Sequence, residues 1–66
     1  MRATFLGLAR ELRATDPEAL ADGLVLVIEG AIASHHVFGR QGPAHAMLAT
    51  CDALIEAATA EARVLG

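Results

Sequence analysis

The segment PEALADGLVLVIEGAIASHHVF, residues 17–38, decides the fold of this chain. Its apolar residues recur at three- and four-residue spacing, which predicts an α-helix. Large side chains cover one broad face of this helix: Leu20, Leu24, Ile28 and Ile32. Roughly two-thirds of the circumference is apolar or small, whereas an ordinary surface helix has an apolar stripe of about 100°. We therefore expect this helix to be covered on more than one side.

Two glycines lie seven residues apart on a second side of the same helix. Gly23 and Gly30 share this side with Ala19 and Ser34, and each glycine costs a helix about 1 kcal/mol relative to alanine. The pattern favours a close approach of another helix backbone at this side. The alternative is that these small residues have no structural role.

Two further helices are predicted, at 1–13 and 43–64. In the first, Phe5, Leu8, Ala9 and Leu12 recur at helical spacing, and in the last, Pro43 suits the first helical position. Pro17 marks the start of the central helix, and the sequence leaves Thr15 and Asp16 as alternative caps. Because residues 39–42 form a short loop, we expect the last two helices to be antiparallel neighbours.

Length and composition indicate one domain, 1–66, that needs a partner. The chain has 66 residues, 55% of them hydrophobic, and a mean hydropathy of +0.46. A chain this short is marginally stable alone, and its single cysteine excludes an internal disulfide. The helices at 1–13 and 43–64 cannot cover every apolar side of residues 17–38. We therefore predict an all-α fold whose last two helices form a four-helix bundle on dimerisation.

Several function classes are disfavoured by charge and pattern. The net charge is −3, and Arg2, Arg10 and Arg13 have Glu11 among them and no interleaved aromatic residue, which disfavours binding of nucleic acid by this chain alone. Asp22, Glu29 and two histidines interrupt the most apolar stretch, so we expect no membrane span. No signal peptide is visible, and a lone thiol fits a reducing compartment, so we predict a soluble cytoplasmic protein.

Residues able to carry chemistry are few. His35 and His36 point about 100° apart on a helix, so they cannot chelate one ion together, and His36 with His45 lacks a third ligand. Cys51 lies on the apolar stripe of the last helix without a placed base, which indicates a small core residue. We therefore expect no catalytic residues, no metal, no cofactor and no enzymatic activity.

The run LADGLVLVIEGA, Leu20 to Ala31, resembles the C-terminal domain of TetR-type transcriptional regulators, in which Leu-Ala-Asp-x-Leu followed by Glu-Gly-Ala opens the penultimate helix. The preceding FLGLARELRATDPEA and the Gly-x-x-Gly-Pro link before an alanine-rich helix are similar as well. The resemblance implies that the last two helices form a four-helix bundle across a two-fold axis. It covers the last third of such a regulator, without the helix-turn-helix and most of the ligand pocket. We therefore expect a truncation, an excised domain or a proteolytic remnant that does not bind DNA by itself.

These observations predict a homodimerisation module. The residues expected at the interface are small or apolar ones of the last two helices: Gly23, Val27, Gly30, Ala31, Ser34, Met47, Cys51, Leu54 and Ala58. The alternatives are a remnant of a sensor for a small apolar ligand, with a pocket between the first two helices, and a helical adaptor that binds a different protein. The sequence leaves open which helix face is internal and which contacts the second copy.

Overall fold

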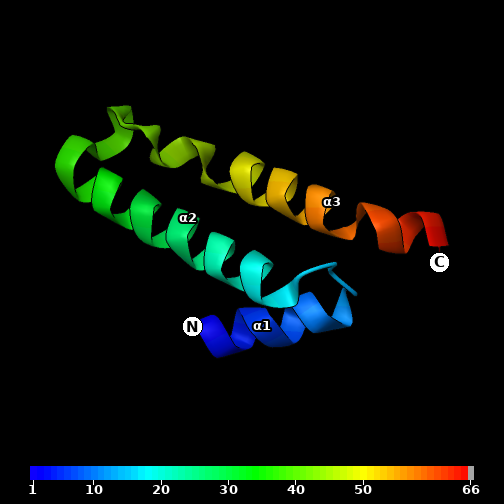
Figure 1. Ribbon diagram of the computed structural model, residues 1–66. Coiled ribbons are helices and arrows are strands. Elements are labelled where there is room, and N and C mark those ends of the chain that lie inside the picture. The colour runs from blue at the N-terminus through cyan, green and yellow to red at the C-terminus, as the bar shows by residue number, and fades with distance from the viewer. Residues whose placement is uncertain (66) are drawn as a thin grey trace.

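The computed structural model, which describes residues 1–65, contains three α-helices and no strand within that range. They are α1 (Arg2–Glu11), α2 (Pro17–Phe38) and α3 (Met47–Leu65). Two 3-10 turns, η1 (Gly39–Gln41) and η2 (Pro43–Ala46), connect α2 to α3. The prediction of an all-α protein with three helices is confirmed. Figure 1 shows that the chain turns back after α2, so that α3 lies alongside it, while α1 lies on the other side of α2.

The start of α2 is determined by Asp16 and Pro17. The Asp16 carboxylate accepts a hydrogen bond from the Ala19 N–H at 3.1 Å, and Pro17 occupies the first turn, where its missing N–H leaves no bond unmade. Of the two alternative caps, Asp16 is therefore the one used. The Thr15 hydroxyl instead donates to Glu61 of α3 at 3.3 Å.

The end of α1 differs from the predicted range of 1–13. Arg13 has a φ of 58°, and its N–H donates to the Arg10 carbonyl, while the Ala14 N–H donates to the Ala9 carbonyl. These paired bonds form a Schellman motif, a helix end that usually places glycine at the left-handed position. Because arginine occupies that position here, the sequence carried no signal for the helix end. The motif brings Ala9 and Ala14 together, and both are buried.

The start of the last helix also differs from the prediction. The range 43–64 was expected to be one helix, but Pro43–Ala46 winds as a 3-10 turn and the α-helix runs over Met47–Leu65. The His45 ring bonds the Gly42 carbonyl through Nδ1 at 2.9 Å, and this carbonyl would otherwise accept from the Ala46 N–H in an α-helical first turn. Gly42 is needed here because a Cβ at this position would lie 2.5 Å from the Phe38 Cβ.

The three helices form an elongated and open arrangement. Its principal extents are 42 × 22 × 12 Å. The radius of gyration is 13.1 Å, whereas a compact domain of this length has one of about 11 Å. Because α1 packs against one side of α2 and α3 against another, much of α2 stays exposed.

This shape leaves a small core. Within residues 1–65 the buried apolar residues are three alanines and two leucines: Ala9, Ala14, Ala21, Leu20 and Leu24. Partly buried side chains of α1 and α3 pack against this cluster: Phe5, Cys51, Leu54, Ile55 and Ala58. The core therefore holds α1, α2 and α3 together near the start of α2 and leaves the second half of α2 with little cover.

Candidate functional site

The α2–α3 pair forms a helical layer with two broad faces, which differ in what covers them. We call the side on which α1 packs the α1 face, and the other side of the α2–α3 pair the opposite face. Helical spacing assigns to the opposite face five residues of each long helix: Ala19, Leu26, Gly30, Ala33 and Val37 of α2, and Ala46, Thr50, Ala53, Ala57 and Val64 of α3. All ten are exposed and none carries a charge.

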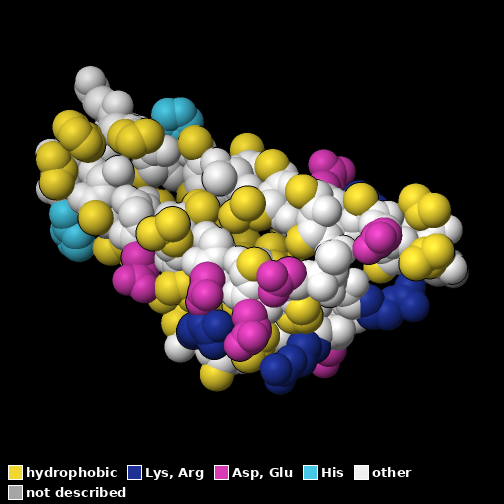
Figure 2. All heavy atoms as spheres, in the orientation of Figure 1, with side chains coloured by type: hydrophobic (Ala, Val, Ile, Leu, Met, Phe, Trp, Pro, Cys, Tyr) yellow, Lys and Arg dark blue, Asp and Glu magenta, His cyan; other side chains and the backbone are white. Residues whose placement is uncertain are grey.

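Large apolar side chains stand out of the opposite face. Leu26 is 74% exposed and Val37 is 73% exposed. By contrast, Glu29 and Asp22 of α2 and Asp52 and Glu56 of α3 fall at other positions around their helices. Figure 2 shows acidic and basic side chains gathered over α1 and the adjoining part of α2, further acidic side chains over α3, and hydrophobic side chains along the space between α2 and α3. The ten residues of the opposite face are uncharged, and Asp16 and Glu61 lie at its edge.

A hollow of about 310 Å³ lies in the opposite face between α2 and the start of α3. A Cβ added at Gly30 would meet no atom within 4 Å, so this position is open. Five residues predicted for the dimer interface line the hollow, together with Pro43, Ala46 and Thr50: Val27, Gly30, Ala31, Ser34 and Met47. They are thus placed together at one surface.

The other four predicted interface residues lie between the helices of the same chain. A Cβ at Gly23 would lie 3.3 Å from Leu54 Cδ1, so this glycine allows α3 to approach α2 closely. Cys51, Leu54 and Ala58 pack against the buried cluster. The two glycines of α2 therefore have different surroundings, with Gly23 inside the molecule and Gly30 outside it.

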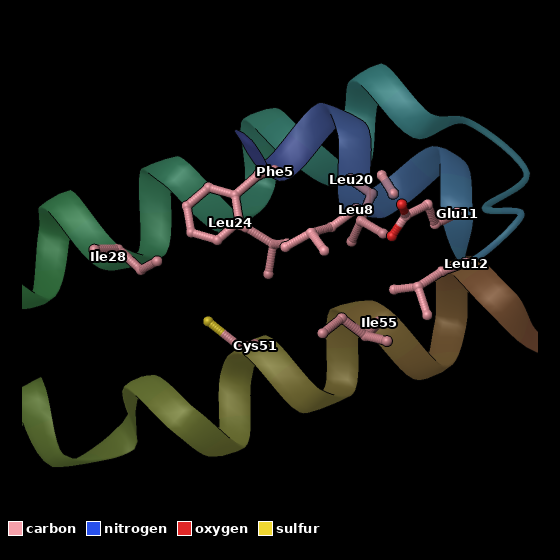
Figure 3. A pocket seen from close by; sticks show the side chains of 10 residues that line it. Phe5, Leu8, Glu11, Leu12, Leu20, Leu24, Ile28, Cys51 and Ile55 are labelled. Atoms are coloured by element: carbon pink, nitrogen blue, oxygen red, sulfur yellow. The ribbon is translucent and has the colours of Figure 1, made fainter. Parts of the chain in front are cut away.

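An apolar cleft opens on the α1 face between α1 and α3, and α2 forms its floor (Figure 3). Its volume is about 290 Å³. The floor consists of Leu20, Leu24 and Ile28, and the walls are formed by side chains of α1 and α3: Phe5, Leu8, Ala9, Glu11 and Leu12, with Cys51 and Ile55. We call this hollow the α1-face cleft. Glu11 is its one charged lining residue.

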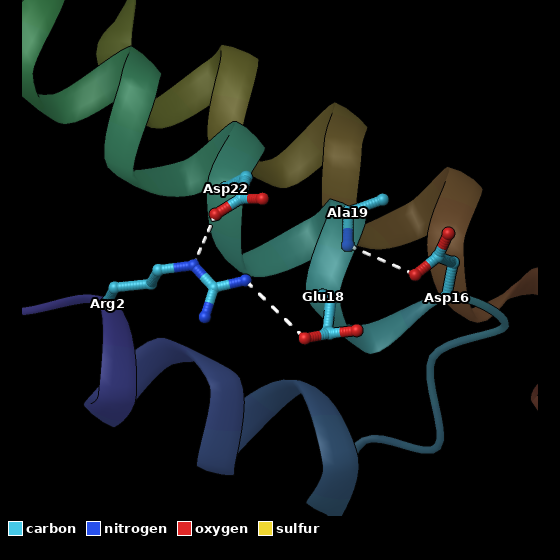
Figure 4. Close-up of polar contacts among 5 residues, drawn as sticks. All are labelled: Arg2, Asp16, Glu18, Ala19 and Asp22. Carbon is cyan, nitrogen blue, oxygen red and sulfur yellow. Dashed lines mark hydrogen bonds and ion pairs between the residues drawn. The ribbon is translucent and has the colours of Figure 1, made fainter.

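Polar contacts fasten α1 to α2 at the far end from the Schellman motif (Figure 4). Arg2 Nε donates to Asp22 Oδ1, and Arg2 Nη2 lies 3.8 Å from Glu18 Oε1. The hydrogen bond from Arg2 lowers the pKa of Asp22 and raises the pKa of Arg2. Because all three side chains are exposed, these ion pairs orient α1 more than they stabilise it.

The link between α1 and α2 is tied to α3 by three further hydrogen bonds. The Thr15 N–H donates to the Ala58 carbonyl at 2.9 Å, and Arg13 Nη2 donates to the Ala62 carbonyl at 3.2 Å. The third is the bond from the Thr15 hydroxyl to Glu61. Sequence analysis missed the roles of Arg2, Arg13 and Thr15, since their partners lie 20 to 49 residues away along the chain and carry no local signal.

Residues able to carry chemistry stay apart in the part of the chain that the structure describes. No three His, Cys, Asp or Glu side chains among residues 1–65 come together as metal ligands. Cys51 is a free, half-buried thiol that points into the α1-face cleft, and His45 bonds a backbone carbonyl. The geometry can thus support packing and binding of apolar groups.

Residues Pro17–Gln41 form a helical stretch of 25 residues that is long and apolar enough to cross a membrane, with a mean hydropathy of 1.3 in its most apolar window. Only 17% of that window is buried in the molecule. The central helix of a soluble assembly has the same length and composition. Whichever environment applies, α2 has an apolar surface that this chain alone does not cover.

No protein-family model matches this chain, and no curated protein and no solved structure was found to resemble it.

Proposed function

We propose that this chain is a homodimerisation module, in which the opposite face packs against the same face of a second copy. The α2 and α3 helices of both copies would then form a four-helix bundle, with each α1 on the outside. A two-fold axis makes such an interface self-complementary, because the same residues meet on both sides. The module has no enzymatic role in this proposal and binds no nucleic acid by itself.

The observation that carries the proposal is the excess of exposed surface. The molecule exposes 4694 Å², whereas a compact monomer of 6.8 kDa exposes about 4,000 Å². The excess is therefore roughly 700 Å², and a stable interface buries about 800 Å² on each partner. A second copy that covers the opposite face would remove an area of this size.

The character of the opposite face supports the same conclusion. Its glycine and alanines allow helices to approach to the lower end of the usual 8–10 Å range, and its exposed Leu26 and Val37 supply apolar area. None of its ten residues is charged, so the centre of the interface would bury no charge, while Asp16 and Glu61 would lie at its edge. The resemblance of Leu20 to Ala31 to TetR-type regulators agrees with a bundle built from the last two helices.

We place the dimer in solution and in the cytoplasm, not in a membrane. Glu29 lies at the midpoint of Pro17–Gln41, and a carboxylate at the centre of a bilayer costs about 2.5–3.5 kcal/mol. Packing against a second copy keeps the Glu29 side chain in water, since it lies outside the opposite face. The apolar stretch is then explained by protein contacts alone.

The experiment that tests this proposal is sedimentation equilibrium on Gly30→Leu. The leucine has room in the isolated chain but fills the hollow, so the variant should be a monomer at concentrations where the unaltered chain is a dimer. Gly7→Leu is the matched control. It gives a similar gain in helix propensity at an open position of α1 and should remain dimeric.

A dimeric Gly30→Leu variant, or a well-folded monomer of the unaltered chain, would overturn the proposal. Recovery of the purified chain only as aggregates that a different protein dissolves would favour the adaptor instead.

A further inference from the structure

We infer that the α1-face cleft binds a small amphipathic cation. The ligand has an aromatic or branched apolar body that lies between α1 and α3, and an ammonium group that lies beside Glu11. This site is on the side of the layer away from the proposed dimer interface, so each copy of the chain carries one, and binding does not depend on dimerisation.

The size and lining of the cleft suit an apolar body. A dry cavity of about 150 Å³ lined by leucine, isoleucine and phenylalanine is large enough to bind benzene. The α1-face cleft has about 290 Å³ and a lining of the same residue types, with Leu24 and Ile28 on its floor and Phe5 on its wall. Ligand pockets of about 300 Å³ are at the small end of the usual range. The cleft therefore fits one ring with a short alkyl arm.

Charge distinguishes the two ends of the cleft (Figure 3). Glu11 lies at one end, beside Leu8 and Leu12, and among residues 1–65 its carboxylate takes part in no ion pair or side-chain hydrogen bond. A bound ammonium group would give it a partner in a partly apolar setting, where the attraction is stronger than in bulk water. A carboxylate ligand would be repelled at the same place.

Among residues 1–65 no arginine forms an ion pair with Glu11. Arg13 and Arg63 line a separate hollow beyond Leu12, and each donates a hydrogen bond to a backbone carbonyl, of Ala62 and Glu56 respectively. Arg2 is held by Asp22 and Glu18 on the side of α1 that meets α2.

The other end of the cleft favours an aromatic ring. Phe5 of α1 and Cys51 of α3 lie on either side of the cleft there, and the sulfur of Cys51 points into it. Aromatic rings pack favourably against both aromatic edges and sulfur. An arylalkyl amine would thus lie along the cleft with its ring at Cys51 and its nitrogen at Glu11.

The test compares three ligands that differ in their head group: phenylbutylamine, phenylbutanol and phenylbutyrate. They are titrated into the chain labelled at its isoleucine δ1 methyl groups, and the spectra are recorded by NMR. Ile28 and Ile55 line the cleft, whereas the remaining isoleucine, Ile32, is 53% exposed outside it and serves as an internal control.

We expect phenylbutylamine to shift Ile28 and Ile55 but not Ile32, and to bind about threefold to tenfold more tightly than phenylbutyrate. Glu11→Gln should remove this preference, while Glu29→Gln, which changes a carboxylate outside the cleft, should keep it. Cys51→Leu places a larger side chain in the cleft and should weaken all three ligands.

Equal affinities for the amine and the carboxylate, shifts of Ile32 alone, or no saturable binding would each overturn the inference. Concentration-dependent broadening of Ile28 and Ile55 without ligand would also overturn it, because a second copy would then occupy the cleft.

Discussion

Both faces of the helical layer present apolar side chains of α2, but they differ in what covers those side chains. On the α1 face, large side chains such as Leu20 and Leu24 are buried at 5% and 6% exposure because side chains of α1 and α3 pack against them. On the opposite face, Leu26 and Val37 stay 74% and 73% exposed because no helix of this chain reaches them. The comparison teaches that each apolar side of α2 needs a covering partner. On the α1 face this partner belongs to the same chain, and on the opposite face it is, in our proposal, a second copy.

The largest expected effect separates the two faces by truncation. Leu24→Ala should lower the free energy of unfolding by about 2–5 kcal/mol, because it removes a buried leucine of the core cluster. Urea unfolding at a protein concentration that keeps the chain monomeric measures this change. Leu26→Ala is the control on the opposite face and should change the monomer by less than about 0.5 kcal/mol. Similar losses for both variants would mean that Leu26 is covered within the monomer.

A charge on the opposite face should have the next largest effect. Leu26→Asp is expected to raise the dimer dissociation constant at least about thirtyfold, or about 2 kcal/mol, since it places a carboxylate in an apolar interface. Leu48→Asp is matched in exposure, at 71% against 74%, but lies outside the opposite face and should leave the constant unchanged. Sedimentation equilibrium compares the two. Weakening by Leu48→Asp alone would place the interface elsewhere.

The two glycines of α2 provide a smaller and sharper comparison. Gly30→Ala should stabilise the monomer by about 0.5–1 kcal/mol, because alanine favours a helix and a Cβ there meets nothing. Gly23→Ala should gain less, since its Cβ would lie 3.3 Å from Leu54 Cδ1 and the leucine has to move. Thermal unfolding of the two variants at one low concentration measures the difference. A larger gain for Gly23→Ala would contradict the close approach of α2 and α3.

The smallest expected effect concerns the ion pair that holds α1. The pKa of Asp22 is lowered by the hydrogen bond from Arg2, so the pair stabilises the fold at pH values above the ordinary aspartate pKa of 3.8. This contribution is lost as the pH falls through the lowered pKa. The stability difference between the unaltered chain and Asp22→Asn should therefore stay constant from pH 7 to about pH 5 and vanish at lower pH. Urea midpoints across this range test it, with Asp52→Asn as a control outside the ion pair.

Local chemistry explains which parts of the fold could be predicted. Asp16 and Pro17 mark a helix start because one supplies a carboxylate for a free N–H and the other needs no N–H bond. The end of α1 gave no such signal, since Arg13 occupies a left-handed position that its neighbours impose through the Schellman bonds. Before α3, Pro43–Ala46 winds as a 3-10 turn, and the His45 ring bonds the Gly42 carbonyl that an α-helical turn would use. Both departures arise from contacts that helix propensity does not describe.

The glycine side of α2 was likewise predictable in part from the sequence. The sequence predicted that another helix backbone would approach both Gly23 and Gly30, because helical spacing puts them on the same side of α2. The structure separates them, since α3 lies close to α2 at Leu54 but no atom approaches a Cβ at Gly30. Nothing in the sequence could have decided this, because the crossing of two helices depends on how the connection between them is wound.

The sequence by itself determined that the chain is helical, and that its middle helix is apolar over more of its circumference than two neighbours can cover. This follows because residue spacing within one helix is set by a fixed backbone geometry. Only the tertiary structure decided which of those sides are internal, and that α1 leaves a cleft beside α3. These features depend on the distances between helices, which arise from packing of side chains far apart in the sequence.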